Sequence, residues 1–311
     1  MLHKNNIIAI VILSALLLGG CNWMSEVSPS NQNDNEEIDK KETDDLYVPV
    51  QEYTGEEYTL PNGKETDRIA NENRREIEKA IKSFFKEDYK TEVKVHNIVG
   101  NVDGGATVFV ESVGKPHFYT YAIIPISKNT EEIRMNDIFT ESGQVERAIM
   151  AGVYGMVNEN EFQNLTDLID DVKKAYNVTG INKKAVPIGA NRYSNEYYFV
   201  SIRKKDNFEI ILENYLDNPR RDKENWSQLI NMENIKPDEI KISIKLYMEE
   251  EGVEPSEEAF NYLVKKIEQA DNLPKGLYSV RLHDNNINIK SASGSKENSL
   301  KRANPNDIVK E

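Results

Sequence analysis

Three histidines of this chain lie in stretches that are typical of β-strands, where an imidazole could act as an acid, a base or a metal ligand. His96 falls on the same strand face as Lys94, and His283 on the same face as Arg281. We interpret both histidines as solvent-facing strand residues. A zinc site normally needs three or four convergent ligands, with local spacings such as HExxH or CxxC, and the sequence contains neither. We expect no metal; convergence of three histidines from separate strands is the alternative.

Nucleophilic catalysis finds equally little support. Ser112 precedes His117 by one short turn, Gly114-Lys115-Pro116, but side chains along one strand and turn need not meet. The G-x-S-x-G pattern of a nucleophile elbow is absent. A serine–histidine pair is therefore a weak alternative to two ordinary strand residues.

Acidic side chains are abundant, and two clusters stand out, Glu249–Glu251 and the group Asp167, Asp170 and Asp171. We interpret both as solvated helix ends or faces, with a glycosidase-like carboxylate pair as the alternative. The glycine-rich segment 101–105 is flanked by two strand patterns and does not open a helix, unlike a phosphate-binding loop. The sequence favours a protein that is not an enzyme and that uses no dissociable cofactor.

Aromatic residues gather in two segments, "HFYTYA" and "RYSNEYYF". Exposed tyrosines can stack on sugar rings or anchor a protein partner. Cross-strand pairing in a core explains the same pattern. Both interpretations stay open for the candidate surface residues, which are His117, Tyr119, Tyr121, Tyr197 and Tyr198.

The single cysteine, Cys21, follows an apolar run over residues 7–18 and two glycines. Lys4 precedes the run, which is shorter than the roughly 20 apolar residues that span a bilayer. This is the layout of a secretory signal peptide, and "LGGC" resembles a bacterial lipobox. That resemblance implies removal of residues 1–20 and a diacylglycerol lipid on the sulfur of Cys21. An ordinary cleaved signal and an uncleaved anchor are the alternatives.

Residues 21–45 are polar and acidic, and we expect a disordered tether behind the lipidated cysteine. The formal net charge of the chain is −14. Nucleic-acid binding depends on neutralising phosphates, so we expect no nucleic-acid partner. Residues 46–290 have the composition of a folded domain, with a possible boundary between two subdomains near 140–185, and the polar tail 291–311 is expected to be partly ordered.

Periodicity predicts the elements of that domain. Helical spacing indicates helices over 65–89, 143–158, 165–176 and 207–216, a shorter one at 226–230, and a last helix from about Pro255. Alternation and turn residues indicate a three-stranded antiparallel meander over 93–126, and strands at 197–202, 240–248 and 277–284. Small residues at Ala148, Ala151, Gly152 and Gly155 indicate close packing of a neighbouring element.

The pattern predicts the α+β class, with helices packed on antiparallel sheets. A helix, a turn and a strand occur near both ends of the domain, at about 77–97 and 260–284. The two stretches match in pattern rather than in residues. They are therefore interpreted as possibly two related helix-plus-sheet units.

Several longer blocks resemble one known family: "YVPVQEYTGEEYTLPNGKETDRIA", "KTEVKVHNIVG", "VFVESVGKPHFYTYAIIPI", "LPKGLYSVRLHDN" and "ENSLKRANPNDIVKE". They are similar to uncharacterised lipoproteins of low-GC Gram-positive bacteria, the domain of unknown function 1672, over residues 47–311. The resemblance implies attachment to the outer face of the cell membrane. It implies no catalytic or ligand-binding residue.

From these observations we expect an extracytoplasmic lipoprotein, held to the membrane by its lipid, that binds or assembles with a protein or a cell-wall ligand. Two alternatives stay open. One is a substrate-binding lipoprotein of a transporter, which normally has two lobes around a cleft. The other is a cell-wall or peptide hydrolase built on carboxylates or on His117.

Overall fold

The described part of the chain begins at Leu46, after the whole of the expected signal peptide and tether. A computed structural model describes residues 46–101, 104–188, 192–203 and 208–311. Cys21 and the predictions for residues 1–45 therefore lie outside the described residues. The described residues all belong to one compact unit. No helix in the described ranges combines the length and hydropathy needed to cross a membrane.

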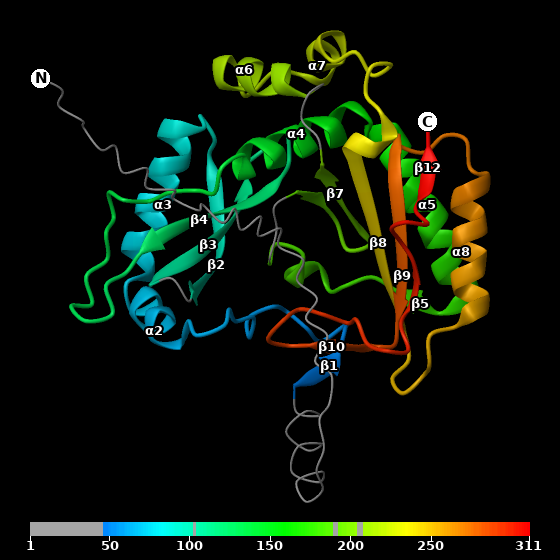
Figure 1. The fold of residues 1–311 in the computed structure, drawn as a ribbon, viewed down its shortest axis with the longest axis horizontal. Coiled ribbons are helices and arrows are strands. Elements are labelled where there is room, and N and C mark those ends of the chain that lie inside the picture. Colours follow the sequence, from blue (N-terminus) through cyan, green and yellow to red (C-terminus); the bar gives the residue numbers. More distant parts are fainter. Residues whose placement is uncertain (1–45, 102–103, 189–191, 204–207) are drawn as a thin grey trace, which may run out of the picture. The chain divides into compact units, whose positions relative to one another are not determined.

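The first half of the domain is the predicted meander with helices on one face. Its elements are α2 (Lys64–Glu72), α3 (Arg74–Asp88), β2 (Val93–Asn101), β3 (Gly105–Ser112) and β4 (Tyr119–Pro125). The strands pair antiparallel in the order β2-β3-β4, as expected (Figure 1). The single helix predicted over 65–89 is two helices, because the chain leaves helical geometry at Asn73, whose amide donates a hydrogen bond to the Ile69 carbonyl.

A second, larger sheet forms the other half. Its strands are β5 (Val178–Thr179), β6 (Tyr193–Ser194), β7 (Tyr198–Ile202), β8 (Ile240–Met248), β9 (Gly276–His283), β11 (Leu300–Arg302) and β12 (Ile308–Lys310). The main order is β11-β9-β8-β7-β6. All pairs are antiparallel except β8 and β9, which run parallel and are joined through α8 (Glu257–Gln269). The tail that was expected to be only partly ordered supplies β11 and β12, which both pair with β9.

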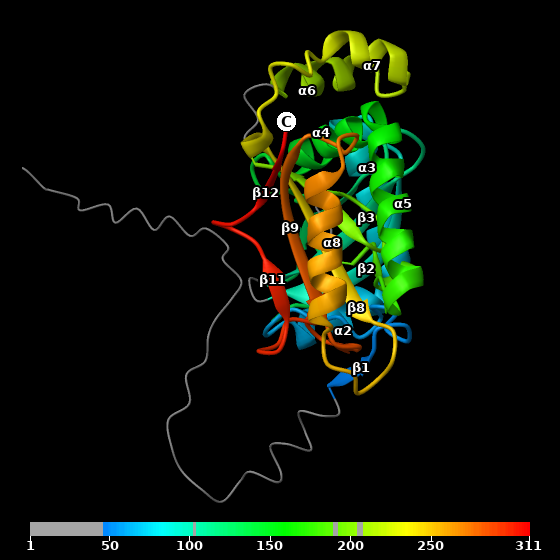
Figure 2. The same cartoon turned by 90° about the vertical axis from the view of Figure 1, so that its right-hand side faces the viewer.

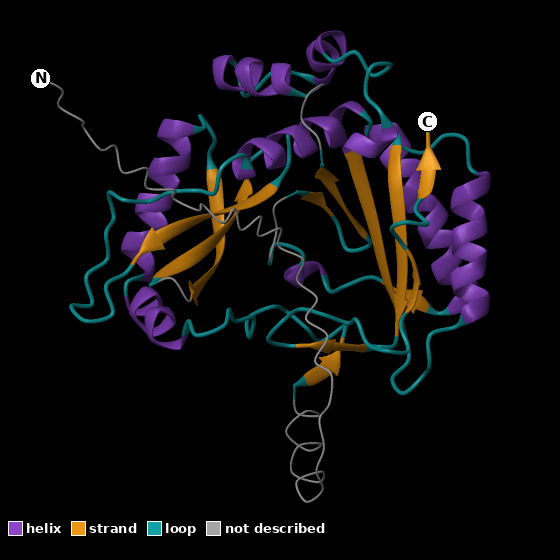
Figure 3. Ribbon diagram, viewed as in Figure 1, coloured by secondary structure: helices purple, strands orange, loops and turns teal. Residues whose placement is uncertain are grey.

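Helices connect and cover these sheets (Figure 3). They are α4 (Gln144–Val157), α5 (Glu159–Tyr176), α6 (Glu209–Asp217), α7 (Lys223–Leu229) and the short turns η1 (Lys183–Ala185) and η2 (Pro237–Glu239). Helices α5 and α8 contact each other and lie on one side of the larger sheet (Figures 1 and 2). A two-stranded ribbon, β1 (Tyr47–Pro49) with β10 (Asn286–Asn288), ties the start of the domain to its end. The fold class is therefore α+β, as expected.

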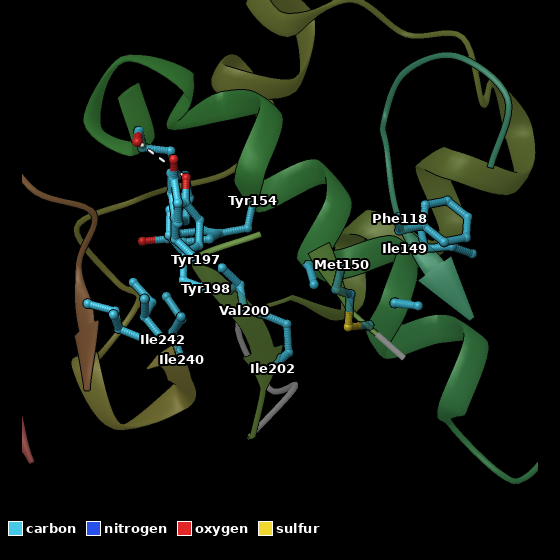
Figure 4. Close-up of a cluster of buried hydrophobic side chains, with 14 of the residues drawn as sticks. Phe118, Ile149, Met150, Tyr154, Tyr197, Tyr198, Val200, Ile202, Ile240 and Ile242 are labelled. Carbon is cyan, nitrogen blue, oxygen red and sulfur yellow. Dashed lines mark hydrogen bonds between the residues drawn. The ribbon is translucent and has the colours of Figure 1, made fainter. Parts of the chain in front are cut away.

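Strand alternation decides which face of the larger sheet is buried under helices. The core face of β8 carries isoleucines 240, 242 and 244 with Leu246, all buried, as the sequence pattern predicted. Helix α4 packs on the matching face of β7 through Ile149, Met150 and Tyr154 (Figure 4). The opposite face of β8, with Lys245 and Tyr247, is left for the elements described below.

The two sheets are joined at a seam. Tyr119 of β4 and Arg192, next to β6, form an isolated antiparallel bridge, with backbone N–H···O distances of 2.8 and 2.9 Å. Helix α4 runs behind this junction, and its glycines make the close approach possible. A Cβ on Gly152 would lie 2.8 Å from the His117 carbonyl oxygen, and one on Gly155 would lie 2.8 Å from the Tyr193 ring. The predicted role of these small residues in close packing is confirmed.

Candidate anion-binding site

A cavity of about 220 Å³ lies beside the seam, on the face of the larger sheet that α5 and α8 leave uncovered. We call it the seam pocket. Its walls come from the β6–β7 hairpin, from β8, from the loop 181–188 and from Tyr58 in the segment before α2. The polar and aromatic groups used below are Arg192, Phe199, Lys245 and Tyr247. With Ser291 and Ala292, which also line the cavity, the site is assembled from five segments of the chain.

Two cations stand over one aromatic ring in this pocket. The guanidinium carbon of Arg192 lies 3.9 Å from the centroid of the Phe199 ring, and the Lys245 ammonium lies 5.3 Å from the same centroid. A cation over an aromatic face is stabilised electrostatically, which compensates part of its lost hydration. The ring of Phe199 thus supports both positive charges where an incoming group can meet them.

Burial and repulsion from nearby positive charges disfavour the charged form of Lys245. Loss of hydration, followed by the positive charges of Arg192 and Arg281, lowers the pKa of Lys245 to about 8. Burial likewise lowers the pKa of Arg192 to about 10, against the opposing effect of Tyr58. Both side chains still carry a positive charge at neutral pH. An anion placed between them would remove the mutual repulsion.

Two other lysines of this region, unlike Lys245, are neutralised by ion pairs with carboxylates. Lys241, on the same face of β8, is paired with Asp307 at 2.5 Å, and Lys296 is paired with Asp284 at 2.8 Å. Lys245, in contrast, forms no ion pair with any described residue. A buried charge without a partner lowers the stability of the folded state. Such a group is a candidate for binding a ligand.

The interpretation of His283 as a solvent-facing residue is wrong. Its side chain is buried, and its Nδ1 lies 2.8 Å from the hydroxyl of Ser299, which the C-terminal segment brings over the sheet. Burial, followed by the charges of Lys245 and Arg281, lowers the pKa of His283 to about 4. His283 is therefore neutral at physiological pH and adds no charge to the site.

His96 and His117 are brought together, by a residue that the sequence interpretation did not single out. Glu111 of β3 contacts both imidazoles, with Oε2 2.6 Å from Nε2 of His96 and Oε1 2.8 Å from Nε2 of His117. A bulge in β2 at His96 turns that side chain toward Glu111. Burial opposes ionisation of Glu111, but the hydrogen bonds from His117 and His96 outweigh it and lower the pKa of the carboxyl.

The Ser112 hydroxyl forms hydrogen bonds with backbone groups and none with His117. Its hydroxyl donates to the carbonyl of Pro116 at 3.0 Å and accepts from the backbone N–H of Phe118 at 2.9 Å. The hydroxyl thus closes the β3–β4 turn, as an ordinary structural serine does.

The acidic clusters are solvated, as interpreted. Glu249–Glu251 are exposed in the turn after β8, and Asp167 and Asp171 are exposed on α5. Asp170 accepts a hydrogen bond from the Tyr197 hydroxyl at 3.0 Å. Across the described ranges, no three histidine, cysteine or acidic residues are grouped so that they could hold a metal ion.

The tyrosines for which a surface role and a core role both stayed open are mostly inside the fold. Tyr119, Tyr197 and Tyr198 are at most 7 % exposed, so the surface interpretation of these three is corrected. Tyr198 packs on Phe162 of α5, and Tyr119 packs on His117. His117 and Tyr121 are half-buried. Tyr197 and Tyr198 still line the seam pocket, together with residues that sequence reasoning missed.

The missed residues are Arg192 and Lys245. One weak signal for Lys245 was present, because alternation placed it on the face of β8 opposite the isoleucines. Nothing local to either residue indicated that the two would lie over the same ring. Their proximity follows from the pairing of β6 with β7 and of β7 with β8.

Comparison with known proteins gives a consistent assignment of the fold. A crystal structure of a DUF1672 family protein from Staphylococcus aureus subsp. aureus Mu50 is similar, with a TM-score of 0.67 and 17 % identity over 86 % of this chain and 98 % of that one. No functionally curated protein is detectably similar in sequence. The model of the family described as "protein of unknown function (DUF1672)" matches residues 40–310. The chain therefore belongs to the DUF1672 family, as the resemblance of its sequence blocks indicated.

Proposed function

We propose that this protein is a lipid-anchored binding protein on the outer face of the cell membrane, and that the seam pocket holds an anionic group of its ligand. The main support for a binding site is the environment of Lys245. This half-buried cation faces two further positive charges and is paired with no carboxylate in the described part of the chain.

The arrangement suits an anion for three reasons. Arg192, next to β6, and Lys245 of β8 both line the cavity, so an oxyanion bound there would lie near both positive charges. The planar guanidinium of Arg192 offers paired N–H donors, the geometry that carboxylates and phosphates fit. Partial exclusion of water strengthens each contact. The aromatic walls then contribute apolar contact with the rest of the ligand.

Anchoring rests on the sequence around Cys21. The apolar run and the "LGGC" motif support lipid attachment, and the acidic residues that follow support a flexible connection to the domain. Replacement of Cys21 by Ala tests this part. We expect the variant to be recovered in the culture medium or mislocalised, whereas normal levels in the membrane fraction would contradict lipid anchoring.

Binding is tested by isothermal titration of the purified chain with inorganic phosphate, acetate and a neutral sugar at pH 7. We expect heat with the anions and none with the sugar. Lys245→Met should abolish the signal, because the methionine keeps the aliphatic length and removes the charge. Lys265→Met is the matched control, since Lys265 is exposed on α8, on the covered side of the sheet. Equal binding by both variants would place the anion elsewhere.

A further inference from the structure

Beyond the seam pocket, three cations stand side by side on adjacent strands. Arg281 of β9 is the register partner of Lys245 in β8, and Lys301 of β11 is the register partner of Arg281. Partners in register present their side chains on the same face of a sheet. We call Lys245, Arg281 and Lys301 the cationic row.

The row has a direction and a length. Neighbouring strands lie about 4.8 Å apart, so three strands carry the charges over roughly 10 Å, perpendicular to the strands. At the β8 end the row meets the pocket, where Arg192 lies over Phe199 of β7. At the other end Lys301 is exposed to solvent.

Small hydroxyl residues lie next to the row. Ser243 and Ser279 are register partners two residues before Lys245 and Arg281, on the same face, and their hydroxyls are 3.2 Å apart. Both serines are buried. The sheet is thus closed to solvent at these two serines, so a ligand would contact the side chains of the row rather than the strands beneath them.

The row is not neutralised within the described residues. Arg281 and Lys301 form no ion pair there, and neither does Lys245, whose ammonium lies over the Phe199 ring. The nearest acidic groups are already used, Asp307 by Lys241 and Asp284 by Lys296. The row thus gathers three positive charges in a chain whose formal net charge is −14.

We infer that the cationic row extends the seam pocket into a binding strip for a linear polyanion, a chain that carries phosphate or carboxylate groups at short intervals. The inference rests on the proposed function, since Arg192 and Lys245 hold the first anionic group. A single small anion accounts for the pocket alone. Arg281 and Lys301 do not line the cavity, so only a ligand that continues past it could contact them.

The test uses ligands of increasing length. The purified chain is titrated with orthophosphate, pyrophosphate, tripolyphosphate and a longer polyphosphate, and in a second series with acetate and glutamate oligomers of matched charge. We expect the dissociation constant to fall at least tenfold from the shortest to the longest member of one series. The series with the larger gain identifies phosphate or carboxylate as the natural group.

Two double variants test which residues cause the increase in affinity with ligand length. Arg281→Gln with Lys301→Gln should remove the dependence on length, while orthophosphate is still bound at Arg192 and Lys245. The comparison variant, Lys90→Gln with Arg220→Gln, alters a second basic area around the exposed Val113 and should leave the gain intact. Unchanged melting temperatures of the unliganded variants show that each still folds.

The outcomes separate the two proposals. Binding of orthophosphate with no gain from longer chains would refute the row and leave the proposed function standing. A gain that disappears in the Lys90/Arg220 variant instead would also refute the row. Absence of binding by any anion would refute the proposed function and the row together. A gain abolished only by the Arg281/Lys301 variant supports the inference.

Discussion

Replacing Lys245 with methionine should make the unliganded protein more stable while it removes anion binding. The ammonium is held away from water and near the positive charges of Arg192 and Arg281, and these contacts lower its pKa from 10.5 to about 8. Methionine retains most of the apolar stem that packs beside Phe199, and it carries no charge that must be desolvated. The substitution therefore separates the requirements of stability from those of binding.

The magnitude follows from linkage between protonation and folding. One pKa unit corresponds to about 1.36 kcal/mol, so a lysine with a pKa of about 8 in the folded state and 10.5 in the unfolded state destabilises the fold by up to about 3 kcal/mol at pH 7. Residual contact of Lys245 with solvent makes this an upper figure. The penalty is full below the folded pKa and disappears as the pH rises to the unfolded pKa, because the unfolded chain binds more protons in that interval.

The assay is urea unfolding of wild type, Lys245→Met and Lys265→Met at pH 7 and pH 9.5. We expect Lys245→Met to be more stable than wild type at pH 7, with a difference that shrinks by roughly 2 kcal/mol at pH 9.5. Burial raises the pKa of Tyr119 and Tyr198, so ionisation of tyrosines also affects stability in alkali. That effect is common to all three proteins and cancels in the difference.

The reasoning would be refuted in either of two ways. A variant that is less stable than wild type at pH 7 would mean that the ammonium makes a stabilising contact that outweighs its desolvation. A difference that does not vary between pH 7 and pH 9.5 would mean that Lys245 titrates like an exposed lysine. In both cases the argument for a ligand at this position would lose its basis.

Further outcomes concern binding, the seam and the histidine pair. Anion affinity should fall as the pH rises through about 8, because Lys245 loses its proton there, and the bound anion should move this loss to higher pH; titration calorimetry from pH 7 to 9.5 measures it. Gly155→Ala should destabilise the fold by about 1–3 kcal/mol in urea, because the new methyl group would meet the Tyr193 ring. Glu111→Gln should lower stability by about 1–3 kcal/mol at neutral pH, since it weakens charge-assisted hydrogen bonds to His96 and His117. Because the folded pKa of Glu111 is lowered, the difference from wild type should persist above pH 4.5 and shrink as the pH falls below that value; an unchanged difference at pH 3 would contradict this account.

Local periodicity was sufficient to predict most elements of the fold. The meander, the amphipathic helix α8 and the alternation of β8 are each encoded within about ten residues, which is the range over which strand and helix periods act. The break at Asn73 was missed because the apolar stripe continues across it. The parallel pairing of β8 with β9 and the pairing of β11 with β9 join distant segments, and no local pattern specifies such registers.

The candidate site depends on the same long-range information. Tyr58, Arg192 and Lys245 come from three separate parts of the chain, and only long-range pairing, such as that of β7 with β8, places them around one cavity. His283 is a second example of missing long-range information. Its strand face was identified correctly beside Arg281, but Ser299 and the rest of the C-terminal segment cover it. Sequence alternation therefore predicts the face of a residue without predicting what covers that face.

The acidity of the chain and its cationic row have complementary effects on selectivity. A formal net charge of −14 repels polyanions from most of the surface, while Lys245, Arg281 and Lys301 attract them to one strip. Repulsion elsewhere acts against nonspecific binding, so the strip gains selectivity without gaining affinity. Salt screens both effects, with a Debye length of about 8 Å at physiological ionic strength. Raising the salt concentration should therefore weaken binding at the row and also reduce the exclusion of polyanions from the remaining surface.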